Sequence, residues 1–246
     1  MRSEKECKHS FSELGGQIMN TENFTGKAEE YAFGRPGYPK EAFDYICSLV
    51  PQDAVFADIG AGTGKFTVEL AKRDYSVFAV EPNADMRGQL EIALAPFSNV
   101  LIMDGTAEVT KLSEHSVDVI TVAHALHWFD LDAFRRECNR ILKPNGIVIA
   151  IYNLTPSGEM IAISKETVDT FFTNPTVNEF SNPMDYTRDK WLAYIASQDN
   201  NPLPLDPDYK AHIAAINEFF ERNSVDGLLH LDRVTKVYSE RIESYL

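Results

Sequence analysis

The stretch ADIGAGTGKFT, residues 57–67, follows a short apolar run and carries glycines at three alternating positions, Gly60, Gly62 and Gly64. Turns of this kind begin phosphate loops, dinucleotide sites and nucleoside-sulfonium sites. A phosphate loop needs a glycine separated by four residues from Gly-Lys, and a hydroxyl residue after them, but Ile59 and Phe66 occupy those places. A dinucleotide site needs a third glycine at position 65, where Lys65 stands. Taken alone, the turn is equally compatible with a tight strand–helix connection.

The next apolar run adds a second feature. VFAVE, residues 77–81, ends in Glu81, 21 residues after Gly60. An acidic side chain at the tip of the strand beside a glycine turn can accept hydrogen bonds from both ribose hydroxyls of a nucleoside. A solvated strand-end glutamate is the alternative when the residue is taken alone.

Strand and helix patterns alternate through the first 153 residues, which predicts an α/β fold with a parallel, Rossmann-like sheet covered on both faces. After Tyr152 the pattern changes: residues 154–222 show helical segments and no good strand, and residues 223–246 alternate like two strands joined near Asp232. The sequence therefore predicts a single domain with four parts: an N-terminal cap (1–50), a cofactor-binding core (51–153), a helical lid insert (154–222) and a closing β-hairpin (223–246). The core strands are expected at 54–60, 76–81, 99–105, 116–126 and 147–153.

Four segments together resemble the class I S-adenosylmethionine-dependent methyltransferases: VFADIGAGTGKFT (55–67), VFAVEPNADM (77–86), VDVITVAHALHWFD (117–130) and RILKPNGIVIAIYN (140–153). YAFGRPGYP (31–39) and ALHWFD (125–130) are similar to a methyltransferase type 11 branch that includes trans-aconitate methyltransferase-like proteins. These motifs are specific for the cofactor and say little about the molecule that is methylated.

The resemblance implies S-adenosyl-L-methionine as cofactor, S-adenosyl-L-homocysteine as product, and a role for each matching position. Asp58 fixes the glycine loop or the cofactor's amino group, while the loop backbone approaches the methionine part. Glu81 takes the ribose. Relatives often end the third strand in Gly-Asp, whereas this chain has Asp104-Gly105, so Thr106 and Ala107 are expected at the adenine instead. The predicted cofactor-binding residues are Asp58, Gly60, Ala61, Gly62, Gly64, Glu81, Pro82, Met86, Thr106, Ala107, Ala123 and His124.

Methyl transfer from a sulfonium requires positioning, desolvation and in some cases one base. His127 is the nearest candidate for that base. Tyr31, Arg35 and Tyr38 belong to the segment that the resemblance folds over the cofactor or substrate, and Arg35 can clamp a carboxylate with two hydrogen bonds. A small-molecule acceptor, with a carboxylate as one option, is therefore expected.

The composition of the chain limits the classes of partner that it is expected to bind. The chain has 246 residues with 23 Lys and Arg against 37 Asp and Glu, a formal net charge of −14, which disfavours a nucleic-acid partner. No apolar run approaches the roughly 18 residues that span a bilayer, and the first residues have no apolar signal region, so a cytoplasmic protein without membrane contact is expected. Met19 is an alternative start. Three separated cysteines indicate neither a disulfide framework nor a metal site.

Two other functions remain open. A non-catalytic S-adenosylmethionine-binding module would carry the same motifs. An NAD-dependent oxidoreductase is disfavoured by Lys65 and by Pro82, which follows the acidic residue directly. Oligomeric state and the methylated atom have no signature in the sequence.

Overall fold

The computed structural model describes residues 25–154, 162–198 and 205–242. Met19 and Cys7 lie outside these residues, as do the first part of the expected cap (1–24), two stretches within the expected lid (155–161 and 199–204) and the end of the expected hairpin (243–246). Within the described chain, no helix combines the length and the apolar character that crossing a bilayer requires.

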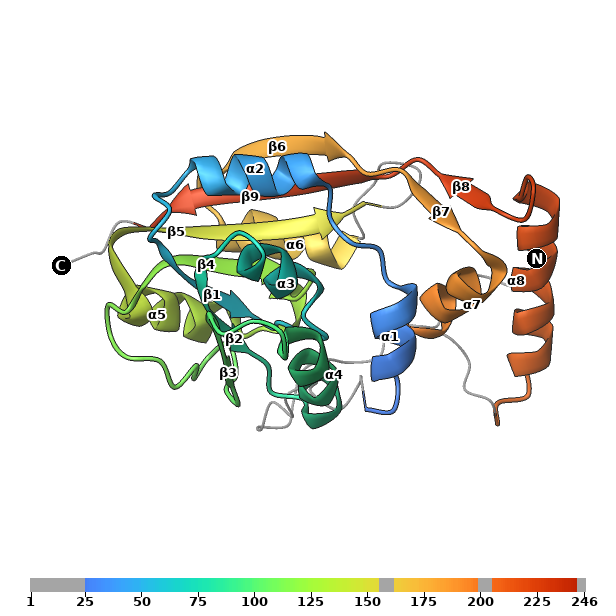
Figure 1. The fold of residues 1–246 in the computed structure, drawn as a ribbon, viewed down its shortest axis with the longest axis horizontal. Helices are drawn as coiled ribbons and strands as arrows, with labels where there is room; N and C mark the ends of the chain where they lie inside the picture. Colours follow the sequence, from blue (N-terminus) through green and yellow to red (C-terminus); the bar gives the residue numbers. More distant parts are fainter. Residues whose placement is uncertain (1–24, 155–161, 199–204, 243–246) are drawn as a thin grey trace, which may run out of the picture.

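A seven-stranded sheet in the order β3-β2-β1-β4-β5-β9-β6 forms the centre of the molecule (Figure 1). Its first five strands in this order are parallel, and β9 is antiparallel to both β5 and β6. The order reverses between β1 and β4, the point at which open α/β sheets bind ligands. The strands are β1 (Val55–Ile59), β2 (Ser76–Val80), β3 (Val100–Met103), β4 (Val117–Ala123), β5 (Leu142–Asn153), β6 (Thr176–Ser181) and β9 (Val234–Arg241).

Helices cover both faces of this sheet, as the mainly apolar sequences of the strands predict. Phe43 of α2 (Lys40–Ser48) and Phe66 of α3 (Lys65–Ala71) pack on one face, and Leu90 of α4 (Ala84–Leu94) adjoins them. Phe134 of α5 (Leu131–Ile141) and Phe171 of α6 (Ala162–Phe171) pack on the other. The two apolar clusters hold the strands in place, so the ends of β1, β2 and β4 are fixed points on which a site can be built.

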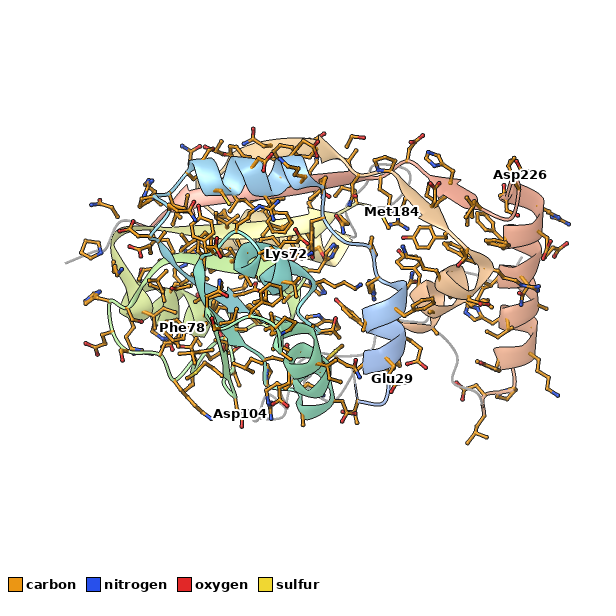
Figure 2. The ribbon with its side chains drawn as sticks, in the orientation of Figure 1. Glu29, Lys72, Phe78, Asp104, Met184 and Asp226 are labelled. Atoms are coloured by element: carbon orange, nitrogen blue, oxygen red, sulfur yellow. The ribbon has the colours of Figure 1, made fainter. Side chains whose placement is uncertain are left out.

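A second group of elements stands apart from the main sheet, and we call it the lid group. It consists of β7 (Met184–Tyr186), α7 (Arg188–Ala196), α8 (Tyr209–Asn223) and β8 (Leu229–Leu231), with its own small core around Tyr186, Trp191 and Phe220. Met184 and Asp226 mark this group in Figure 2, away from Lys72 and Phe78 of the main body.

Helix α1 (Ala28–Gly34) lies between the lid group and the main body, on the side toward which β1 and β5 point (Figure 1). It packs on α7 and also contacts α4. At Gly34 the two backbones meet: a Cβ there would lie 2.2 Å from the backbone nitrogen of Tyr194. Helix α1 therefore joins the lid group to the main body.

The expected α/β fold is confirmed, including the five parallel strands and the helices after residue 160. The expectation of no strand between residues 154 and 222 is wrong, because β6 and β7 lie there. The side chains of β6 are mostly exposed and polar, so the strand has no apolar alternation for a sequence pattern to detect. It forms because the free edge of β9 offers backbone hydrogen bonds, and these do not depend on side-chain type.

The expected closing hairpin is also wrong in its pairing. Both strands exist, but β8 pairs with β7 in a separate two-stranded sheet, whereas β9 lies between β5 and β6. Because both edges of β9 are already occupied, β8 has no edge of β9 to pair with. The chain instead passes from the lid group to the main sheet at Asp232 and Arg233.

Candidate functional site

The glycine loop after β1 holds a left-handed backbone at all three glycines, with φ of 71° at Gly60, 57° at Gly62 and 86° at Gly64. At Gly60 a Cβ would lie 2.7 Å from Ala125 Cβ, which leaves no room for it, and at Gly64 a Cβ would lie 2.7 Å from Leu90 Cδ1, the end of a side chain that packs over the turn. At Gly62 nothing lies within 4 Å of that position. Gly60 and Gly64 thus serve packing, whereas Gly62 faces open space.

Asp58 lies beneath this loop and is fully buried. Its carboxylate accepts hydrogen bonds from the hydroxyls of Thr67 (2.6 Å) and Thr121 (2.9 Å), which ties β1 to α3 and β4. Burial is the main cause that raises its pKa to about 6, and the two hydroxyls oppose the rise. Asp58 lines neither cavity described below, so its position suits fixing the loop more directly than contact with a ligand.

Glu81 follows β2 and faces the same loop, with 7% of its surface exposed. Its Oε2 accepts a hydrogen bond from the backbone N–H of Gly62 (2.8 Å), and its Oε1 accepts one from that of Asn83 (2.9 Å). Burial raises the pKa of this carboxyl, and the two backbone donors counteract the effect. Each oxygen keeps acceptor capacity for one more donor.

A cavity of about 740 Å³, counting the space open to solvent at its mouth, lies over the strand ends, and we call it the strand-end cavity. This volume falls in the range of small-molecule and cofactor sites. Four of the lining residues were not predicted from the sequence: Glu108, Ala125, Trp128 and Phe129. Its walls are Tyr31, Gly60, Gly62, Glu81, Pro82, Met86, Thr106, Ala107, Glu108, Ala123, His124, Ala125, Trp128 and Phe129. Ten of these were predicted from the sequence; Asp104 is absent from the wall, and its exposed carboxylate lies 3.3 Å from Arg87.

A second cavity adjoins the first and shares Tyr31, Gly60, Gly62, Ala123 and His124 with it. We call it the cationic cavity, because Arg35, Lys65 and Arg233 line it and no carboxylate does. Tyr194 of α7 brings the lid group into its wall. The full lining is Tyr31, Arg35, Pro36, Tyr38, Gly60, Ala61, Gly62, Thr63, Lys65, Phe66, Ala123, His124, Asn153, Tyr194 and Arg233. The predicted cap residues Tyr31, Arg35 and Tyr38 thus come together here with Ala61.

His124 lies at the end of β4 on the wall that both cavities share. Its φ of 57° places a non-glycine residue in the left-handed region, a strained state that is concentrated at functional sites. The ring Nε2 accepts the backbone N–H of Asn153 (2.6 Å), and burial with the nearby charge of Arg35 lowers the ring's pKa to about 3. The ring is therefore neutral at pH 7 and carries its proton on Nδ1.

His127 lies in the short helix η2 (Leu126–Trp128) and lines neither cavity. Its Nδ1 is 3.4 Å from Ser164 Oγ, and its ring packs on Trp128. Burial lowers its pKa to about 4, so the ring is neutral at pH 7. The structure brings His124 and not His127 to the cavity wall, and a base role for His127 stays a prediction.

Sequence reasoning missed Asn153, Tyr194 and Arg233. Asn153 ends the last motif segment (140–153), whereas Tyr194 and Arg233 belong to segments outside the motifs. Arg233 precedes β9, far from the glycine loop in sequence, and no local pattern marks it. The one hint in the sequence is that Arg233 stands at a position where the alternation of the neighbouring residues would place an apolar side chain. Among the described residues, no cluster of three or more His, Cys, Asp or Glu forms a metal site.

Residues 57–150 match a family described as a methyltransferase domain. An uncharacterized methyltransferase of Mycobacterium tuberculosis is 36% identical over 131 residues, 53% of this chain and 52% of that protein. The chain thus spans about half the length of the curated relatives it matches.

Solved structures share the fold. A proposed type II methyltransferase from Anaeromyxobacter dehalogenans superposes with a TM-score of 0.64 at 21% identity, over 86% of this chain and 99% of that one. A Haemonchus contortus phosphoethanolamine N-methyltransferase, solved with phosphomonomethylethanolamine and S-adenosylhomocysteine, gives a TM-score of 0.52 at 14% identity, over 93% and 61%. Residues 57–150 thus match a methyltransferase domain, and the chain, with its glycine loop, the acidic residue after β2 and the strand order described above, shares the fold of these solved structures.

Proposed function

We propose that this protein binds S-adenosyl-L-methionine across the two cavities and transfers its methyl group to a small-molecule acceptor. The observation that carries the proposal is Glu81, whose two oxygens each keep acceptor capacity beside the open space over Gly62. A vicinal diol needs two such acceptors side by side. The methyltransferase match at residues 57–150 and the S-adenosylhomocysteine bound to a protein of the same fold support it.

The residues present fit the cofactor. Glu81 would hold the ribose hydroxyls, while Pro82, Met86, Thr106 and Ala107 would enclose the adenine in the strand-end cavity. The open position over Gly62 lets a ligand lie against the loop backbone. The methionine part would then extend past Ala123 toward the cationic cavity. When bound, this cofactor supplies an activated methyl group on a positively charged sulfur.

The protein's own contribution to the reaction would be positioning and exclusion of water. Ala123, Ala125, Trp128 and Phe129 make the wall near His124 weakly polar, and a dry surrounding favours a transfer in which the charge on sulfur disappears. The neutral His124 ring has a donor at Nδ1, which could orient an acceptor by a hydrogen bond. Its pKa of about 3 makes it a weak base at pH 7.

The division into cap, core, lid and closing segment is part of this proposal. The strand-end cavity lies within the matched residues 57–150 except for Tyr31, whereas Arg35, Tyr38, Asn153, Tyr194 and Arg233 of the cationic cavity lie outside them. The matched domain would therefore provide the cofactor half of the site. The cap and the lid group would provide the acceptor half.

The test has two stages. Calorimetric titration with S-adenosylhomocysteine, S-adenosylmethionine and NAD separates the proposal from an NAD-dependent oxidoreductase, and we expect binding of the first two only. Incubation with methyl-labelled S-adenosylmethionine and a metabolite extract then separates an enzyme from a non-catalytic binding module. Tight cofactor binding without label transfer to any extract would support the module, and absence of binding would overturn the proposal.

A further inference from the structure

The side chain of Arg233 is the least compensated charge among the described residues of the site. It is 5% exposed, and no carboxylate of the described chain lies within the 4.0 Å that defines an ion pair. Its Nη1 donates to the carbonyl of Leu154 at 3.3 Å, and its Nε has no hydrogen-bond partner. A buried charge is normally paired or hydrogen-bonded, because leaving water without compensation costs several kcal/mol.

Other cations surround it. Arg35 binds Ser197 through Nε and Nη2 and also has no carboxylate partner among the described residues. Both guanidinium groups are close enough to His124 to lower the pKa of its ring. Lys65 lines the same cavity, and its pKa is lowered by burial and by the charge of Lys190 on α7. In a chain with a net charge of −14, cations are thus gathered in one cavity that no acidic side chain lines.

The cofactor would not neutralise this cavity. S-adenosylmethionine carries one carboxylate, one ammonium and one sulfonium, a net charge of +1. Its carboxylate can form an ion pair with one of the cations, but the molecule as a whole adds positive charge to the cavity. A neutral or cationic acceptor would leave the remaining cations unpaired in a half-enclosed site.

We propose that the acceptor is an anionic small molecule, a carboxylate or a phosphate monoester, and that Arg233 binds its anionic group. This inference rests on the proposed function and names the substrate class of that same site. Arg233 lies in the connection from the lid group to β9, with its guanidinium 4.9 Å from the ring centroid of Tyr194 and 5.8 Å from that of Tyr186. These rings hold the planar group in one orientation, which suits a fork of hydrogen bonds to two oxygens.

The experiment uses the full chain saturated with S-adenosylhomocysteine, at constant ionic strength. The probes are two matched pairs, glutarate against glutaramide and glycerol 3-phosphate against glycerol. Their binding is measured by thermal unfolding and by calorimetry. We expect one anion of the two pairs to raise Tm and bind, while its neutral counterpart does not. Equal binding of the anion and its neutral counterpart, or no binding of either anion, would overturn the proposal.

Variants assign the effect to Arg233. Arg233→Gln should lower the affinity for the anion by about ten- to a hundredfold and leave the affinity for S-adenosylhomocysteine unchanged. The matched control is Arg222→Gln on α8, whose side chain is 73% exposed, and this variant should bind the anion as the wild type does. Unchanged anion affinity in Arg233→Gln would contradict the assignment. Failure of all variants and the wild type to bind S-adenosylhomocysteine would instead contradict the proposed function.

A stability measurement distinguishes ligand binding from a packing role. Because Arg233 is buried without a counter-charge, Arg233→Met should unfold at the same or a higher Tm in the absence of ligands and should lose the anion-dependent rise. Should Arg233→Met unfold at a lower Tm and keep the anion-dependent rise, Arg233 serves packing and the proposal is wrong. Lys65→Gln gives a second, independent variant, and we expect a smaller loss of anion affinity because Lys65 is less buried.

Discussion

At the scale of single residues, Glu81 combines two tasks in one carboxylate. It holds the backbone of Gly62 and Asn83 in place and keeps acceptor capacity toward the strand-end cavity. Glu81→Ala should therefore lower the affinity for S-adenosylhomocysteine by about ten- to a hundredfold, which is equivalent to about 1.5–3 kcal/mol of charge-assisted hydrogen bonding.

Calorimetry measures this loss, and two further variants locate its origin. Glu81→Gln keeps one acceptor oxygen and should lie between Glu81→Ala and the wild type. Glu91→Gln, an exposed acid on α4, should bind as the wild type does. Wild-type affinity in Glu81→Ala would refute the ribose assignment.

Asp58 makes a prediction about the pH dependence of stability. Its pKa rises from an ordinary 3.8 to about 6 because the charged form is buried, which corresponds to about 3 kcal/mol. Below about pH 4 the group is protonated in the folded and the unfolded chain; between pH 4 and 6 only the unfolded chain ionises, so this group's stabilisation is lost as pH rises.

Asp58→Asn removes this ionisation. We expect the unfolding free energy of the wild type to fall relative to that of Asp58→Asn by up to about 3 kcal/mol between pH 4 and 7, as measured by urea denaturation. The substitution also removes an acceptor for the hydroxyl of Thr67 or Thr121, and this changes the free energy of unfolding of the variant by an amount that does not depend on pH. The exposed Asp53→Asn serves as control. Parallel curves for wild type and Asp58→Asn would show that Asp58 ionises normally in the folded protein.

At the scale of elements, the contact between α1 and α7 depends on Gly34. Glycine-to-alanine changes in helices usually stabilise by about 0.5–1 kcal/mol. Here the added Cβ would lie 2.2 Å from the backbone nitrogen of Tyr194, and backbone cannot move aside as a side chain can. Gly34→Ala should therefore destabilise by about 1–3 kcal/mol, because α1 and α7 must separate.

Gly37→Ala is the matched control, since nothing lies within 4 Å of its added Cβ. Thermal unfolding of both variants checks the sign of each change. If Gly34→Ala is as stable as Gly37→Ala, the close packing of α1 on α7 is not part of the protein in solution.

At the scale of the whole molecule, charge is distributed unevenly. The chain has 14 more acidic than basic residues, whereas the described cationic cavity concentrates arginine and lysine on its walls. A polyanion gains affinity by neutralising several phosphates along an open surface, which this balance disfavours. A small anion can instead enter the cavity and meet the cations without the surrounding acidic surface.

We therefore expect label from S-adenosylmethionine to appear in small metabolites and not in total RNA or DNA. Incubating the protein with each fraction in parallel, at low and at moderate salt, checks this. Salt-sensitive incorporation into a polymer, with none in the metabolite fraction, would contradict it.

The sequence by itself determined most of the strand-end cavity. Gly60, Gly62 and Glu81 lie in short segments whose glycine spacing and strand ends are local properties, so their joint position over the sheet follows from the order of the amino acids. The same holds for the five parallel strands, whose sequences are mainly apolar.

Tertiary structure decided which distant segments complete the cationic cavity. β6 has polar, exposed side chains and exists because β9 offers a free edge, and β8 pairs away from β9 because both edges of β9 are taken. Arg233 meets Arg35 only through this arrangement, since the two residues lie on segments far apart in the sequence. Backbone pairing at sheet edges and the gathering of distant charges depend on the folded neighbours of a residue. No local pattern of side chains encodes them.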